Sequence, residues 1–223
     1  MIKKIRLSAA LGLFISLSML WSLVQTVYQA INTADANAKS QHWFLALEIV
    51  LGLVIVYLPK VIAKIFKFNL PEVIYTFFLL FIYGSIYLGT VNHFYRLTYW
   101  DKGLHLISGP LLSAFGIATL NFFFNDEVRH KLNRFFISFY AVAFAVLGGV
   151  LWEFYEFTCD SFGMNLQRYM KNGHPLVGRA ALMDTMGDLW MDFLGALLFA
   201  VFVYFKLKKD KYWLQKFEFS KEL

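Results

Sequence analysis

Six long apolar segments alternate with short polar ones along the chain, and this pattern predicts a protein that crosses a membrane six times. A helix needs about 20 apolar residues to span the hydrocarbon core of a bilayer. We therefore expect an all-α, polytopic membrane helical bundle in which residues 1–223 form a single integral membrane domain. The predicted spans cover about residues 7–28, 43–59, 72–91, 102–124, 135–157 and 185–205.

Basic residues gather in alternate loops. Because short cytoplasmic loops of membrane proteins carry an excess of lysine and arginine, this distribution predicts that both termini are cytoplasmic. We expect the first span to remain uncleaved, although the small residues of "ADANA" at 34–38 offer a cleavage site. The four basic groups on one side are Lys3, Lys4 and Arg6; Lys60, Lys64 and Lys67; Arg129, Lys131 and Arg134; and Lys206, Lys208, Lys209 and Lys211.

The composition agrees with membrane insertion and excludes other classes. Hydrophobic residues make up 59% of the chain and charged residues only 16%, which is too apolar for a soluble domain. The formal net charge is +6, and the Lys and Arg residues that produce it fall mainly in the short gaps between apolar segments and in the C-terminal tail. It therefore predicts membrane lipids as partners and no nucleic acid. The single cysteine, Cys159, excludes an intramolecular disulfide and a CxxC metal pair.

Ionisable residues cluster at the predicted outer ends of the last three spans. A charge inside a membrane helix costs about 2.5 to 3.5 kcal/mol on insertion scales, so each one needs a reason. Residues three or four apart share a helix face, so the ionisable residues of each span should lie on one face of that helix. The groups are Asp101 with His105, Glu153 with Glu156, and Asp184 with Asp188 and Asp192.

Several carboxylates gathered in a low dielectric must share protons or bind a cation. Carboxylate oxygens with one imidazole suit a divalent ion, with magnesium, manganese, calcium and zinc all conceivable. Simple alternatives remain for Asp101 and Asp184, which would cap helix starts, and for Glu156, which would lie in interfacial water. The expected metal ligands are Asp101, His105, Glu153, Glu156, Asp184 and Asp188.

Four further residues are candidates for the same site. Arg168 and Arg179, in the loop before the last span, could neutralise the carboxylates or bind an anionic substrate headgroup. Glu48, in the outer half of the second span, and Asp192, the deepest carboxylate, remain open as members. Gly195, with Gly148 and Gly149, is expected to let helices approach closely.

The chain resembles the YjdF-like family of bacterial inner-membrane proteins from about residue 58 to residue 198. The likeness is sharpest in "YWDKGLHLISG", "LWEFYEF" and "DTMGDLWMDFLGA". It is more distantly similar to VanZ-like envelope proteins, but has Glu156 where that pattern has Gln and Asp192 where it has Asn. These resemblances imply a bacterial cytoplasmic membrane location and hint at envelope lipid or cell-wall chemistry. The VanZ-like matches are Asp101, Lys102, His105, Glu153, Arg179, Asp188 and Gly195.

Three functions are compatible with these residues. The first is a cation-binding protein that acts on an envelope lipid or cell-wall-related substrate. If it is an enzyme, it would be a metal-dependent membrane hydrolase with His105, Glu153 and Asp188 as catalytic residues. The second is an ion- or proton-coupled transporter that uses the ladder from Asp184 to Asp192. The third is a non-catalytic scaffold or accessory protein in which the cluster joins helices. The sequence leaves the substrate and the oligomeric state open.

Overall fold

The computed structural model describes residues 6–221, and nearly all of its regular structure is helical. Each predicted span coincides with a helix that is long and apolar enough to cross a membrane, which confirms the all-α membrane fold. Lys3 and Lys4, which support the predicted orientation, lie outside the described residues. The orientation itself stays a prediction. The six membrane-length helical segments are Leu7–Asn32, Ala36–Ile65, Glu72–Val91, Trp100–Phe123, Arg134–Asp160 and Arg179–Lys209.

The chain divides into two compact units, one of residues up to 100 with the tail from 219, and one of residues 101–218. The single membrane domain expected over residues 1–223 stays a prediction.

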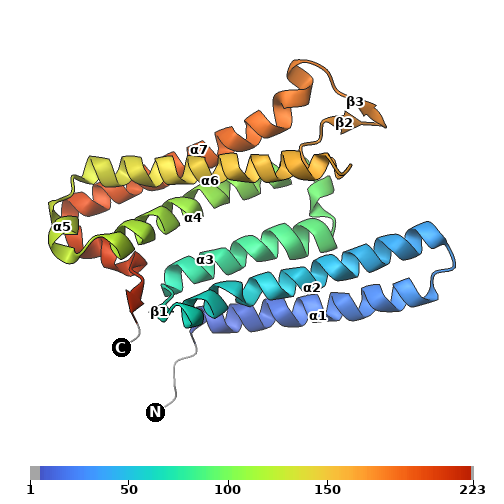
Figure 1. The fold of residues 1–223 in the computed structure, drawn as a ribbon, viewed down its shortest axis with the longest axis horizontal. Helices are drawn as coiled ribbons and strands as arrows, with labels where there is room; N and C mark the ends of the chain where they lie inside the picture. The colour runs from blue at the N-terminus through green and yellow to red at the C-terminus, as the bar shows by residue number, and fades with distance from the viewer. Residues whose placement is uncertain (1–5, 222–223) are drawn as a thin grey trace, which may run out of the picture. The chain divides into compact units, whose positions relative to one another are not determined.

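The N-terminal unit is built on the hairpin of α1 (Leu7–Asn32) and α2 (Ala36–Ile65), which pack along each other (Figure 1). The Asp35 carboxylate caps α2 by accepting a hydrogen bond of 2.7 Å from the amide of Ala38. A third helix, α3 (Glu72–Ile82), continues as the π-helical segment η1 (Tyr83–Val91) and is followed by the short η2 (Phe94–Arg96). The core between these helices includes Ile15, Met19, Ile49, Val56 and Leu79, all fully buried.

Helix α2 is longer than the span expected from its apolar run. The sequence placed the end of that span at Pro59, whereas the helix continues through this proline to Ile65. Proline removes one backbone hydrogen bond, and neighbouring groups in a membrane bundle can compensate for it. In the turn before Pro59, the Tyr75 hydroxyl donates to the carbonyl oxygen of Val56 at 2.9 Å. Beyond α2, β1 (Phe68–Asn69) pairs antiparallel with β4 (Ser220–Lys221).

The C-terminal unit consists mainly of α4 (Trp100–Phe123), α6 (Arg134–Asp160) and α7 (Arg179–Lys209). Successive long helices run in opposite directions, so the start of α4, the end of α6 and the start of α7 lie at the same end of the unit (Figure 1). The other elements are α5 (Asp126–Lys131) between α4 and α6, the hairpin of β2 (Met170–Lys171) and β3 (His174–Pro175) between α6 and α7, and η3 (Lys211–Phe217) after α7.

Glycines allow α4 and α7 to approach closely. A Cβ atom added to Gly195 of α7 would lie 2.9 Å from Cδ of Pro110 and would also collide with the carbonyl oxygen of Leu106. A Cβ atom added to Gly109 of α4 would lie 2.6 Å from the backbone nitrogen of Ala196. Because each glycine faces the partner's backbone, neither position has room for a side chain. This crossing agrees with the expectation that Gly195 lets two helices approach closely.

Replacing Gly195 with alanine should therefore separate α4 from α7 and lower the free energy of unfolding by about 1 to 3 kcal/mol. The matched control is Gly103→Ala, at a position of α4 where an added Cβ would meet nothing within 4 Å. The thermal unfolding midpoint of the detergent-purified protein measures both effects. Equal midpoints for the two variants would contradict the close crossing.

Candidate functional site

The acidic residues singled out in the sequence lie where α4, α6 and α7 meet at one end of the C-terminal unit. Helix α7 begins at Arg179, well before the apolar stretch expected to start at 185, because residues 179–183 are strong helix formers, Arg-Ala-Ala-Leu-Met. Asp184 is therefore inside the helix and does not cap its start, which corrects the capping alternative for this residue. Asp188 and Asp192 follow on the same face, and both are buried.

Lys102 joins α4 to the first two carboxylates of this face. Its Nζ lies 2.9 Å from Oδ1 of Asp184 and 2.8 Å from Oδ2 of Asp188. It also donates to the backbone carbonyl oxygen of Asp184 at 2.9 Å. The Lys102 side chain is 19% exposed and that of Asp188 only 1%. Lys102 therefore neutralises charge that the surrounding apolar helices cannot solvate.

Asp192 has polar partners on α4. Its Oδ2 lies 3.1 Å from Nδ1 of His105, and its Oδ1 accepts a hydrogen bond from the hydroxyl of Ser108. When the carboxylate is ionised, it selects the tautomer in which Nδ1 of His105 carries the proton. The other ring nitrogen, Nε2, then faces the cluster with a free lone pair and lies 3.7 Å from Oδ1 of Asp188.

A glycine on α6 makes room for the Asp192 carboxylate. A Cβ atom added to Gly149 would lie 2.6 Å from its Oδ2, so a larger residue would displace the acid from His105. Toward the C-terminus of α7, the buried residues after Asp192 are apolar. The polar ladder of α7 therefore ends at Asp192, and the transporter alternative, which expects a polar route beyond it, stays a prediction. These apolar residues are Gly195, Ala196, Ala200, Val203 and Leu207.

Helix α6 contributes Glu153 and Glu156. Glu153 is 4% exposed, and its Oε2 accepts a hydrogen bond of 3.1 Å from Nε2 of Gln167. Gln167 also donates to the hydroxyl oxygen of Thr185 on α7, at 3.0 Å. Glu156 is less buried and accepts a hydrogen bond of 2.9 Å from Nε1 of Trp152 on its own helix. Glu153 is thus part of the buried cluster, whereas Glu156 lies at its edge.

The loop after α6 folds back onto the cluster. The Asp160 carboxylate at the end of α6 accepts hydrogen bonds from the backbone amides of Leu166 and Gln167. This turn brings Nη2 of Arg168 to 3.2 Å from Oδ2 of Asp101 and Nη1 to 3.7 Å from Oδ1 of Asp184.

The remaining candidates lie apart from these contacts. Arg179 is exposed at the first residue of α7. Glu48 belongs to the N-terminal unit, where it lines a separate cavity.

Three of the six expected ligands have the arrangement of a metal site. Asp101, His105 and Asp188 each offer one ligand atom, and these atoms all lie within 4.8 Å of one another. Of the other three, Asp184 is held by Lys102 and Arg168, and Glu156 by Trp152. Among the described residues, three buried carboxylate oxygens have no hydrogen-bond partner: Oε1 of Glu153, Oδ2 of Asp184 and Oδ1 of Asp188. Such oxygens are rare in folded proteins and are found where a bound water or ion, or a catalytic role, accounts for them.

Sequence reasoning did not assign roles to Lys102, Ser108, Asp160 or Gln167. Lys102 is part of the Asp-Lys-x-x-His pattern, and this pattern could have identified its ammonium group as a partner of the carboxylates. Ser108 lies one turn after His105, so the helical spacing of α4 also pointed to it. Asp160 and Gln167 make their contacts only because the loop after α6 folds back, and no sequence pattern predicted that fold.

Comparison with known proteins agrees with a membrane fold. Residues 4–209 match the family described as "Predicted membrane protein (DUF2238)". An uncharacterized protein of the bacterium Thermotoga maritima is 30% identical over 164 residues, which cover 70% of this chain and 74% of that protein. No solved structure matches the chain. The expected membership in a family of membrane proteins is confirmed, while neither match carries the YjdF or VanZ name.

Replacing Lys102 with methionine should leave Asp184 and Asp188 without their shared cation and lower the free energy of unfolding by about 3 kcal/mol. The control is Lys131→Met, which removes the pair with Glu127, in which both side chains are at least 74% exposed. Such a surface pair contributes about 0 to 1 kcal/mol. Chemical or thermal unfolding in detergent measures the difference. A Lys102→Met protein as stable as the control would show that the cluster does not need this cation.

Proposed function

We propose that this chain, which belongs to the DUF2238 family of predicted membrane proteins, binds a divalent cation at Asp101, His105 and Asp188 and uses it on an envelope lipid or cell-wall-related substrate. The protein would act as a multi-pass protein of the bacterial cytoplasmic membrane, with the cluster on the extracytoplasmic side. The observation that carries the proposal is the placement of His105 between Asp192 and Asp188.

That placement supports a metal-ligating role for His105. Histidines that bind metals almost always donate their second ring N–H to a carboxylate or carbonyl group, which orients the ring and raises its basicity. Asp192 supplies such a carboxylate at Nδ1. Nε2 is then directed toward the acidic residues with which it would share the ion. Asp192 would be a positioning residue for His105 rather than a ligand.

The charge balance of the cluster also supports a cation. Six carboxylates gather here, from Asp101, Glu153, Glu156, Asp184, Asp188 and Asp192. The permanent cations among the described residues with which they pair are Lys102 and Arg168. The excess of negative charge attracts a cation, and the unpaired Oδ1 of Asp188 is available to ligate it.

The ligand set favours a hard or borderline divalent ion. Two carboxylate oxygens and one imidazole suit magnesium, manganese, calcium or zinc. Three protein ligands leave coordination positions open for water or substrate, as in catalytic rather than structural zinc sites. A bound ion of this kind could polarise a phosphoryl or acyl oxygen. The protein would supply Glu153, whose Oε1 has no partner, as the general base.

Arg168 supports an anionic substrate. Its guanidinium pairs with Asp101 and Asp184, but the side chain is still 40% exposed. A guanidinium has five N–H donors, so an Arg168 that holds two carboxylates can also bind a phosphate group that arrives from outside. Arg179 would add a second, exposed cation to the same approach. A lipid headgroup at the membrane surface has this chemistry.

The same ion pairs favour a second candidate function. Lys102 and Arg168 link α4, α7 and the loop before α7, as would be expected if the cluster held a scaffold or accessory protein together. The unpartnered oxygens of Glu153 and Asp188 are the features that this alternative does not use. Metal analysis separates the two candidates, because interhelical pairs need no divalent ion.

The detergent-purified protein should bind about one divalent ion per chain. The double variant Asp188→Asn with Glu153→Gln should lose this ion because it removes two carboxylates of the cluster. The control is Glu127→Gln, which removes one exposed carboxylate of α5. Inductively coupled plasma mass spectrometry measures the metal, and a rise of the unfolding midpoint on addition of each ion measures the binding.

The same preparations are then assayed for the release of phosphate or acyl groups from lipid-linked substrates. Activity should be present in the wild type and in Glu127→Gln and absent in the double variant. A folded wild-type protein that holds no divalent ion and hydrolyses no lipid-linked substrate would refute the proposal. Metal binding without hydrolysis would support the proposed cation site and contradict the proposed enzymatic activity.

Asp192→Asn tests the positioning role separately. The variant should still bind the ion, because Asp101, His105 and Asp188 remain, but with an affinity about 10 to 100-fold lower. His105→Gln should abolish binding. The control is Ser113→Ala, which changes another buried polar residue of α4. Titration of the metal-free protein measures the affinities, and an unchanged affinity in Asp192→Asn would sink the assigned role.

A further inference from the structure

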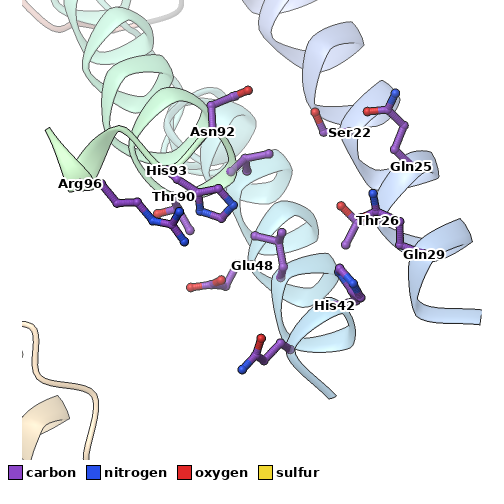
Figure 2. Close-up of a pocket in the computed structure, with 13 residues that line it drawn as sticks. Ser22, Gln25, Thr26, Gln29, His42, Glu48, Thr90, Asn92, His93 and Arg96 are labelled. Atoms are coloured by element: carbon purple, nitrogen blue, oxygen red, sulfur yellow. The ribbon is translucent and has the colours of Figure 1, made fainter. Parts of the chain in front are cut away.

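A polar cavity of about 500 Å³ lies in the N-terminal unit, between α1, α2, the end of η1 and η2 (Figure 2). It lies near the short loop that joins α1 to α2, since Gln29 and Gln41 are among the residues that line it. Asp101, His105 and Asp188 are not among the residues that line it. Its volume is within the range of about 300 to 1,000 Å³ found for small-molecule sites.

Polar stripes on two apolar helices form much of the cavity wall. Ser22, Gln25, Thr26 and Gln29 of α1 are spaced at three and four residues, so they share one helix face. Figure 2 shows this row along α1, on the wall of the cavity. Thr26 is only 5% exposed, whereas apolar neighbours on other faces of α1, such as Trp21 and Val24, are exposed.

The second stripe, on α2, reaches deep into the helix. Gln41 and His42 lie near its start, and Glu48 lies about 7.5 Å along the axis beyond residue 43, where the predicted span begins, at about 1.5 Å per residue. A carboxylate at this depth of a membrane helix is unfavourable unless it faces water, a partner or a ligand. The cavity is the environment that α2 provides for it.

Opposite charges line this cavity without neutralising each other. Among the described residues, no ion pair joins Glu48 to Arg96, and the side chains of Gln25, Gln29 and Gln41 have no hydrogen-bond partner in the protein.

The backbone turn before η2 brings Arg96 to the cavity. His93 adopts a left-handed conformation, with φ of 61°, which is uncommon for a residue with a side chain. This turn separates η1 from η2, and His93 and Arg96 both line the cavity (Figure 2). The cavity therefore offers an anion-binding group and a cation-binding group, each without a side-chain partner in the part of the chain that the structure describes.

We propose that this cavity binds a zwitterion that carries a phosphate and a primary ammonium group. The phosphate would lie at Arg96 with His93, because a guanidinium donates to two phosphate oxygens at once. The ammonium would lie at Glu48, and the amides and hydroxyls of α1 would bind the remaining oxygens. This chemistry belongs to the headgroup of phosphatidylethanolamine and equally to soluble phosphoethanolamine. The experiment distinguishes these two sources.

Isothermal titration of the full-length protein in detergent tests the proposal with four probes: phosphoethanolamine, dioctanoyl phosphatidylethanolamine, dioctanoyl phosphatidylglycerol and inorganic phosphate. The wild type should bind at least one of the two ammonium-bearing probes saturably. Glu48→Gln should weaken that binding about tenfold or more, because it removes one charge-assisted contact, and should leave inorganic phosphate unaffected. Arg96→Gln should weaken binding of every phosphate-bearing probe.

The matched control is Lys39→Gln, which removes an exposed charge of α2 outside the cavity. It should bind every probe as the wild type does, and unfolding midpoints confirm that the variants are folded. Binding of the lipid alone identifies a headgroup site, and binding of phosphoethanolamine identifies a site open to the soluble solute. Failure of both ammonium-bearing probes to bind the wild type, or binding that survives Glu48→Gln and Arg96→Gln, overturns the proposal. The experiment adds no metal, so its failure leaves the cation proposal standing.

Discussion

The acidic end of the C-terminal unit depends on the pairing of Lys102 with Asp184 and Asp188. Carboxylates in an apolar helix bundle lose their hydration, and this loss is tolerable only where a cation or hydrogen-bond donors replace the water. Lys102 supplies that cation from α4 to two successive turns of α7. The pairing also orients the two helices, because it requires the start of α4 to face the acidic stripe of α7.

The close crossing of α4 and α7 then determines the environment of His105. Gly109 lies one turn after His105, and the carbonyl oxygen of Asp192 is the atom nearest to the Cβ position of this glycine. The two backbones therefore approach closely within about one turn of the histidine, and Nδ1 of His105 reaches the Asp192 carboxylate. The small residues of the crossing and the polar contacts above it are two parts of one arrangement. A wider crossing would remove the acid that sets the tautomer of His105.

The N-terminal unit accommodates its polar groups differently. Its buried core is a conventional set of apolar side chains, while Glu48 and Arg96 line a cavity without forming an ion pair with each other. Glu48 and Arg96 form no ion pair with each other and can bind a ligand, whereas Asp184 and Asp188 are both ion-paired with Lys102. The two units thus represent two ways to place charged groups in membrane helices: neutralisation by ion pairs, and exposure to a cavity.

The helices and the shared faces of the acidic residues could be predicted from the sequence, because both follow from local chain geometry. A span is recognised by the length of its apolar run, and the four-residue steps from Asp184 to Asp192 place these side chains on one face whatever surrounds them. The partners could not be predicted in this way. The contacts of Asp192 with His105 and of Lys102 with Asp188 depend on the rotation and crossing of helices more than 80 residues apart in the chain. Apolar helices in lipid have weakly distinct faces, so only their packing shows which polar groups meet.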